Sequence, residues 1–268
     1  MNETKTTTNQ ELFLANHKRY HKQITFYRFF FFIGFLILWE TAANFHWIDS
    51  FFFSSPSRVV TCIINLLLEK ELLLHIGITL METLVSFLLV IILGIVFAAL
   101  LWYSPTISDI TEPYLVVLNS LPKSALAPLF IVWLGTGTKT IIIAGMSVAI
   151  FGAIISIYTC FKEVEPDKLM LIKTLGGNKK DELFKVILPS SIPTLLSIMK
   201  VNIGLSLVGV IIGEFLAARK GLGYLIIYGS QVFQLDMVIS SILILCIIAM
   251  FLYQCIQWLE HFYKRKKK

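Results

Sequence analysis

Long apolar runs separated by short polar segments dominate the chain. Crossing the roughly 30 Å hydrocarbon core of a membrane takes about 20 mostly apolar residues in a helix. Six runs meet that requirement, at about 26–45, 77–102, 112–134, 140–160, 191–217 and 238–258. The pattern predicts an all-α membrane protein with about six transmembrane helices.

One further apolar stretch, residues 57–74, has a different pattern. It follows Ser54-Ser55-Pro56-Ser57 and carries the charged residues Arg58, Glu69 and Lys70 beside its apolar positions. Such a pattern is typical of an amphipathic helix that lies in the membrane interface. We expect this helix on the extracytoplasmic side.

Composition supports a membrane protein and argues against nucleic-acid binding. Hydrophobic residues make up 56% of the chain and charged residues 15%, against roughly 25% charged in soluble domains. The net charge is +6, but the basic residues lie between the apolar runs and form no single solvated face. The four cysteines form no CxxC pair and no disulfide framework.

The distribution of Lys and Arg predicts the orientation. Basic residues are concentrated in residues 1–25, in the loop 161–190 and in the C-terminal tail, and are sparse in the other loops. Cytoplasmic loops carry this excess. We therefore expect a cell-membrane protein with a cytoplasmic tail (1–25), a transmembrane domain (26–260) that includes the cytoplasmic loop 161–190, and a basic cytoplasmic tail (261–268). Residues 46–75 and 218–236 are then outside.

Polar residues and prolines inside the predicted spans indicate a transport path. A charge at mid-bilayer costs about 2.5–3.5 kcal/mol and usually faces a bundle interior or an aqueous cavity. A proline removes a backbone donor, which is tolerated where the helix lines protein or water. The candidate path residues are Asn119, Pro122, Lys123, Pro128, Asn202, Ser206 and Glu214. The alternatives are an internal salt bridge for Lys123 and Glu214, and snorkelling to the headgroups for Glu40, Glu82 and Lys200.

The loop 161–190 has the pattern of a docking segment. Its apolar residues recur at helical spacing on both sides of Gly176-Gly177. This predicts a helix-turn-helix whose second helix ends at Pro189, with Pro193 opening the next span. Leu175, Leu183 and Phe184 are the expected contacts with a partner. The alternative is an amphipathic connector that lies on lipid.

No constellation for catalysis or for a metal or cofactor is present. The run from Gly135 to Thr140 resembles a phosphate loop, but Thr138 stands where such a loop needs glycine before Lys139. The sequence also lacks HExxH, GxSxG and paired Cys/His motifs. We expect no catalytic, cofactor-binding or metal-binding residues.

The loop resembles the signature of permease subunits of binding-protein-dependent ABC importers. That signature is Glu-Ala-Ala, three residues, Gly, nine residues, an aliphatic residue, one residue and Leu-Pro. Gly176, Val186 and Leu188-Pro189 match its second half, whereas Met170-Leu171-Ile172 replaces Glu-Ala-Ala. The nitrate/sulfonate/taurine branch is also similar at Leu38-Trp39-Glu40, Ser55-Pro56-Ser57, Asn119-Ser120-Leu121-Pro122, Lys173-Thr174-Leu175-Gly176, Gly213-Glu214-Phe215-Leu216 and Gly221-Leu222-Gly223-Tyr224.

This resemblance implies the ABC importer permease fold and a non-catalytic role in solute import. It implies two permeases in the lipid membrane, either two copies of this chain (a homodimer) or two homologous subunits. It also implies an extracytoplasmic solute-binding protein and two ATPase subunits that bind and hydrolyse the ATP. No nucleic acid is involved. The solute would be a sulfonate-, nitrate- or taurine-like anion or a small vitamin precursor. The implied ATPase-coupling residues are Lys173, Leu175, Gly176, Gly177, Leu183, Phe184, Val186, Leu188 and Pro189.

Three other functions are compatible with a polytopic membrane protein. An energy-coupling-factor scaffold also recruits ATPases, but by Ala-Arg-Gly-type motifs that this sequence lacks. A secondary transporter would show related halves with ion-coupling carboxylates. A membrane enzyme would need a clustered metal or nucleophile set. Co-purification of ATPase subunits and a binding protein distinguishes the importer from all three.

Overall fold

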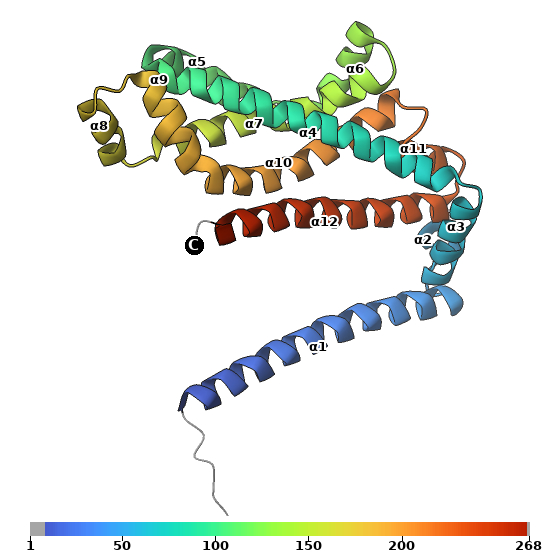
Figure 1. The fold of residues 1–268 in the computed structure, drawn as a ribbon. Coiled ribbons are helices and arrows are strands. Elements are labelled where there is room, and N and C mark those ends of the chain that lie inside the picture. The colour runs from blue at the N-terminus through green and yellow to red at the C-terminus, as the bar shows by residue number, and fades with distance from the viewer. Residues whose placement is uncertain (1–8, 267–268) are drawn as a thin grey trace, which may run out of the picture. The chain divides into compact units, whose positions relative to one another are not determined.

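The structure is a computed structural model that describes residues 9–266, and every regular element in that range is a helix (Figure 1). This confirms the all-α prediction. The chain divides into two compact units, one up to Cys62 and one from Ile63 onward. Residues 1–8 of the predicted N-terminal tail and residues 267–268 of the basic tail lie outside the described residues.

The first unit contains the first span and a tight turn after it. Helix α1 runs over Asn9–Asn44, of which 22–44 is apolar enough to cross a membrane, and α2 covers Ser50–Phe53. The Trp39 indole donates to the Phe53 carbonyl at 3.3 Å. The Glu40 carboxylate accepts from the Ser57 amide at 3.0 Å and from its hydroxyl at 2.9 Å. Glu40 therefore caps the start of the next helix.

That next helix, α3, runs over Pro56–Leu68 and matches the amphipathic stretch expected at 57–74, but it is shorter. Lys70, with a φ of 60°, separates α3 from the second span, which starts at Glu71. The second span is therefore longer than the predicted 77–102, because the charged pair Glu69-Lys70 and not the apolar pattern sets its start.

Three long helices form the core of the second unit. They are α4 (Glu71–Tyr103), α7 (Thr138–Lys162) and α10 (Leu188–Ala217), and α7 packs against both of the others (Figure 1). A side chain at Gly145 of α7 would place its Cβ 2.6 Å from the Ser86 hydroxyl and 2.7 Å from Val210. Glycine thus allows the three backbones to approach closely, as membrane helices do where dispersion contacts hold them together.

The remaining helices of this unit each pack on one side of that core or, like α8, project from it. They are α5 (Pro105–Ser120), α6 (Lys123–Leu134), α8 (Pro166–Thr174), α9 (Lys179–Asp181), the π-helix η1 (Glu182–Ile187), α11 (Leu222–Gln231) and α12 (Leu235–Lys266). In the whole described range five helical segments can cross a membrane, and α5 with α6 makes a sixth span bent by 94°. The expectation of about six spans is confirmed. The third one begins at Pro105, earlier than the predicted residue 112.

The expectation that Pro189 ends a helix is wrong. The helix continues from Lys179 through Pro189 and Pro193 to Ala217. A proline ring clashes with the carbonyl four residues earlier in an α-helix. Here the wider π-helical turn of η1 directly precedes Pro189, and it gives the ring the room that an α-turn would deny.

Candidate docking surface and transport path

The turn between α8 and α9 is fixed by glycines and a helix cap. Gly176 has a φ of +80°, and any side chain at Gly177 would collide with Ile172. The Asn178 side chain accepts from the amides of Lys180 and Asp181 at 2.9 and 3.1 Å, and the Asp181 carboxylate accepts from the Asn178 amide at 3.0 Å. This reciprocal capping box makes the turn a defined structure.

An ion pair holds the two sides of that turn together. Lys173 on α8 lies 3.7 Å from Glu182, whose side chain is buried on η1. Lys185 pairs with Asp181 at 2.7 Å, one helical turn away. The segment is thus a braced helix-turn-helix, and this part of the sequence expectation matches its geometry.

An apolar surface remains uncovered on this segment. It consists of Met170, Leu171, Leu175 and Phe184, which we call the α8–η1 surface; Leu175 is 74% exposed. Lys173 and Pro189 are also exposed, whereas Val186 and Leu188 are half-buried.

Leu183 does not belong to that surface, although the sequence predicted it as a partner contact. It is only 8% exposed and packs with Ile187 against Ala98, Ile157 and Phe161 of α4 and α7. Leu183 and Phe184 are adjacent in a helix, so their side chains point to different sides. Leu183 therefore anchors the segment to the helical core.

The third span is broken at Pro122, one of the two prolines that were expected to line a path. Leu121 and Pro122 are extended, and α6 starts at Lys123. The Lys123 ammonium donates to the Leu118 carbonyl at the end of α5 and lies 5.1 Å from the centre of the Phe151 ring. Lys123 is thus a cap for α5, where a positive charge is favourable.

The other prolines and polar residues of this span are peripheral in the single chain. Asn119, Pro122 and Pro128 are exposed, and Pro128 lies inside α6 without breaking it. The Asn119 side-chain oxygen faces α7, since a Cβ on Gly152 would lie 3.3 Å from it.

On α10, by contrast, the predicted polar residues are buried. Asn202 donates to the Ile198 carbonyl at 2.9 Å. The Asn202 side-chain oxygen and the Ser206 hydroxyl are buried and have no hydrogen-bond partner among residues 9–266. Unpaired buried polar atoms are costly, so their presence on one helix marks a position that packing alone does not explain.

Glu214, near the end of α10, is the centre of a buried polar junction. Its carboxylate accepts from the Thr79 hydroxyl at 2.7 Å and from the Gly223 amide at 2.6 Å. Thr79 in turn accepts from the Leu222 amide at 2.9 Å, and the Gly221 amide donates to His75 at 2.8 Å. No salt bridge links Glu214 to Lys123 in the described structure. The junction instead ties α4 to the start of α11.

Glu82 belongs to the same junction and does not snorkel, contrary to the simplest expectation from sequence. It is 1% exposed and its carboxyl group lies against that of Glu214. Sequence reasoning missed His75, Thr79 and Glu82 as a group. Their spacing of four and three residues puts them on one face of the second span, and that polar stripe was the available signal.

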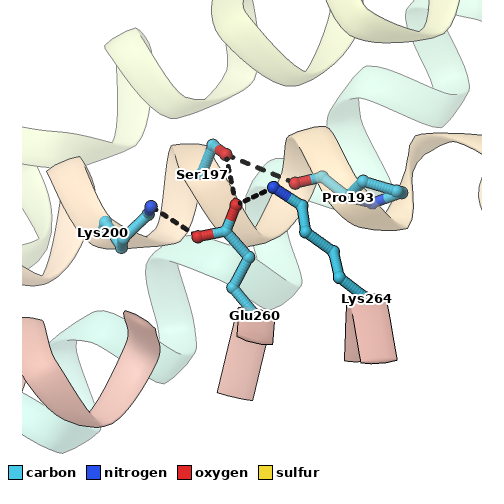
Figure 2. A network of polar contacts seen from close by, with 5 residues as sticks. All are labelled: Pro193, Ser197, Lys200, Glu260 and Lys264. Atoms are coloured by element: carbon cyan, nitrogen blue, oxygen red, sulfur yellow. Dashed lines mark hydrogen bonds and ion pairs between the residues drawn. The ribbon is translucent and has the colours of Figure 1, made fainter. Parts of the chain in front are cut away.

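A second polar cluster connects α10 to α12 (Figure 2). The Glu260 carboxylate accepts from Lys200 at 2.5 Å and from Lys264 at 2.7 Å, and Ser197 lies 3.5 Å from it. One of the two interpretations of the sequence has Lys200 reach for the lipid headgroups. Its charge is instead neutralised by a residue 60 positions later in the chain.

Comparisons with known proteins agree with the resemblance seen in the loop. The family model of the binding-protein-dependent transport system inner membrane component matches residues 90–268. A probable ABC transporter permease protein of Haemophilus influenzae is 31% identical over 84% of this chain and 91% of its own length.

Several relatives carry names that state a solute, and two of these relatives are among the most similar. The formylaminopyrimidine transport permease protein ThiX of Halalkalibacterium halodurans is 27% identical over 72% of this chain and 77% of its length. The taurine transport system permease protein TauC of Escherichia coli is 25% identical over 81% of each.

Solved structures agree in fold. An inward-facing MetNI methionine ABC transporter chain superposes with a TM-score of 0.63 at 17% identity, over 71% of this chain and 94% of the other. An amino acid ABC transporter chain superposes with a TM-score of 0.58 at 16% identity, over 76% and 97%.

Proposed function

This chain belongs to the family of binding-protein-dependent transport system inner membrane components and is the permease subunit of an ABC importer, and from that premise we propose how it works. We propose that it passes a small organic solute from an extracytoplasmic binding protein into the cell. ATP is hydrolysed on separate ATPase subunits. The names of two relatives, which carry taurine and formylaminopyrimidine, support a solute of that size.

The observation that carries this proposal is the α8–η1 surface. Its four large apolar side chains protrude from a segment that is capped by Asn178 and braced across its turn by the ion pair of Lys173 with Glu182. Apolar anchors at the centre of an interface usually supply most of its affinity. We assign this surface to the ATPase, with the exposed Lys173, Lys180 and Lys185 at its rim.

The continuous helix beyond η1 connects the α8–η1 surface to the other end of the bundle. Residues 179–217 form one helical run of 39 residues from the α8–η1 surface to Glu214. Because Leu183 and Ile187 lock the start of the run into the core, a displacement of the docked segment moves α10 with it. The buried polar atoms of Asn202 and Ser206 lie along this run, inside the single chain.

The exposed faces of α5 and α6 support a dimer. Most residues of these helices are exposed in the single chain, including Asn119, Pro122 and Pro128. We propose that a second copy of the chain covers them and that the solute passes between the two copies. Both termini and the α8–η1 surface then face the cytoplasm. A cysteine placed at Lys180 should not react with an impermeant thiol reagent in intact cells. Reaction with the reagent would contradict that orientation.

Purification of the tagged permease from its own membrane tests the ATPase contact. We expect an ATPase subunit to co-purify in equal amount and to hydrolyse ATP. Phe184→Asp places a charge in the apolar contact, so we expect binding to weaken by about 2 kcal/mol or more, roughly thirtyfold. Lys180→Ala, at the exposed rim of the same segment, is the matched control and should leave both measurements unchanged.

Retention of the ATPase by the Phe184→Asp protein would show that the α8–η1 surface is a connector without a docking role. The amount of permease in the membrane, measured in the same experiment, separates that result from a failure to insert.

A further inference from the structure

The last turn of α4 leaves a backbone carbonyl open to a donor from another part of the chain. Helix α4 ends at Tyr103, and α5 begins two residues later at Pro105. The last carbonyls of an α-helix have no amide partner within it. The amide of Ile107, which would reach the Tyr103 carbonyl in a continuous helix, donates instead to the Ser104 hydroxyl at 3.4 Å.

Lys179 supplies the missing donor from a position 76 residues further along the chain. Its ammonium donates to the Tyr103 carbonyl at 3.3 Å and lies 5.6 Å from the centre of the Tyr103 ring. A positive charge is favourable at the carboxyl end of a helix, and an aromatic face attracts the same cation. Two interactions of one side chain thus fasten α9 to α4.

The capped turn before Lys179 fixes where this residue lies. Lys179 is the first residue of α9 and follows Asn178, the residue of the capping box. Leu175 and Phe184 of the α8–η1 surface lie on either side of the same turn. A displacement of that surface therefore displaces Lys179 as well.

Helix α4 extends this contact to the other end of the bundle. It is continuous over 33 residues, and Figure 1 shows α9 and α11 at opposite ends of it. At the α11 end, the Thr79 hydroxyl donates to the Glu214 carboxylate of α10 and accepts from the Leu222 amide. The helical run that begins at Lys179 and ends in α10 is therefore fastened to α4 at both of its ends.

The other contact at the Lys179 end is apolar and has no preferred direction. Leu183 and Ile187 pack with Ala98 of α4. Packed helices can slide past each other by small amounts, whereas a hydrogen bond sets a distance and an angle. Lys179 thus adds a directional contact between the docked segment and α4.

We propose that Lys179 is a positioning residue of the transport cycle, which makes α4 follow the docked segment so that α4 and α10 move together. The inference rests on the proposed docking of an ATPase at the α8–η1 surface. Lys179 itself needs no contact with the ATPase, because its ammonium is directed at α4. Without this bond the ATPase would still bind and hydrolyse ATP, but the displacement would reach α10 alone.

The test follows the movement of α4 in the permease–ATPase complex in detergent, and it does not require the solute. The four native cysteines are replaced, and a cysteine that carries an environment-sensitive fluorophore is placed at Glu71, which is exposed at the far end of α4. We expect ATP with vanadate to change the emission. Lys179→Ala should reduce that change about threefold while the amount of bound ATPase stays the same. Lys179→Arg, which keeps a cation with donors, should restore it.

Two further variants serve as a control and as a second probe. Lys168→Ala is the matched control, because Lys168 is an exposed lysine of the same segment whose ion pair, with Glu165 at 3.2 Å, reaches no other helix. It should keep the full response. Tyr103→Leu removes the ring but leaves the carbonyl, so its response should be intermediate. It replaces Lys179→Ala if that variant does not assemble.

A full response in Lys179→Ala would show that Lys179 only caps α4, and loss of the ATPase from that variant would make Lys179 part of the docking contact. Either result overturns the inference, as does a reduced response that Lys179→Arg fails to restore. A wild-type complex with unchanged emission would show that α4 stays still, and would also overturn it. In each of these cases the proposed function stands if an ATPase co-purifies with the wild-type permease. Absence of the ATPase from the wild-type protein would overturn that function and this inference together.

Discussion

The three-helix core and the broken span α5–α6 differ in how many of their residues are buried and in whether the helix is continuous. In α7 eleven residues are buried, among them Gly145 and Ala149, and the helix is uninterrupted over 25 residues. In α5 and α6 only Ser108 and Ala127 are buried, and a 94° bend separates the two helices. Val132 of α6 is 80% exposed.

This difference separates what holds the permease together from what can move. Close packing transmits displacement and resists rearrangement, because a void or a clash costs energy at once. A span with few buried contacts and a proline break has little to lose when it changes position. The core therefore suits the transmission of force from the proposed ATPase contact, and α5–α6 suits the gating of the proposed path between two copies.

The most damaging change should be one that pushes the core helices apart. Gly145→Val places methyl groups where Ser86 and Val210 already lie, and we expect a destabilisation on the order of 3 kcal/mol. The amount of protein in the membrane and its melting temperature in detergent measure the effect. Gly204→Val on α10 is the control, since a Cβ added at Gly204 would have no atom of another element within 4 Å. Equal loss in both variants would show that close packing at Gly145 is not what holds the core.

An intermediate effect is expected at the helix break. Pro122→Ala restores a backbone donor and allows α5 and α6 to align, so the α5–α6 span should lose part of its bend. We expect solute uptake by reconstituted vesicles to fall about fivefold, the factor that about 1 kcal/mol gives, without loss of protein or of bound ATPase. Pro56→Ala, at the first position of α3, should transport normally, because a proline there replaces no helical hydrogen bond. Loss of protein in the Pro122→Ala variant would show that the break is needed for folding. The proposed difference between the core and the α5–α6 span would then be wrong.

The smallest effect is expected at Lys123. Its ammonium stabilises the end of α5 through the Leu118 carbonyl and the Phe151 ring, and such helix-end charges contribute about 0.3–1 kcal/mol. Lys123→Ala should therefore reduce uptake about two- to fivefold. Lys139→Ala, at the exposed start of α7, is the comparison. Complete loss of uptake with normal assembly would mean that Lys123 contacts the solute itself.

Local features of the sequence were sufficient to predict the fold. The apolar runs predicted the spans and Gly176-Gly177 predicted the turn, because each of these acts on its own few residues. The prolines of the third span did not show which of them breaks the helix, since Pro122 lies at the break and Pro128 lies inside α6. The span limits were less accurate where a charged pair such as Glu69-Lys70, with no strong apolar contrast, decides the start of a helix.

The pairing of distant side chains could not be predicted in the same way. Glu82 with Glu214, and Lys200 with Glu260, join residues far apart in the chain, so no local pattern contains them. The misassignment of Leu183 has a related cause. Helical spacing identifies an apolar stripe, but Leu183 and Phe184 are neighbours, and only packing against Phe161 decides which of the two is buried.

The π-helix at Glu182–Ile187 sets an angle as well as accommodating a proline. Each residue of an α-helix turns the chain by about 100°, so a wider turn resets the direction of every side chain beyond it. This single irregularity therefore fixes how far α10 is rotated about its own axis relative to the direction of Phe184. Removing one residue from it would rotate the buried polar face of α10 away from its present direction while leaving both ends chemically intact.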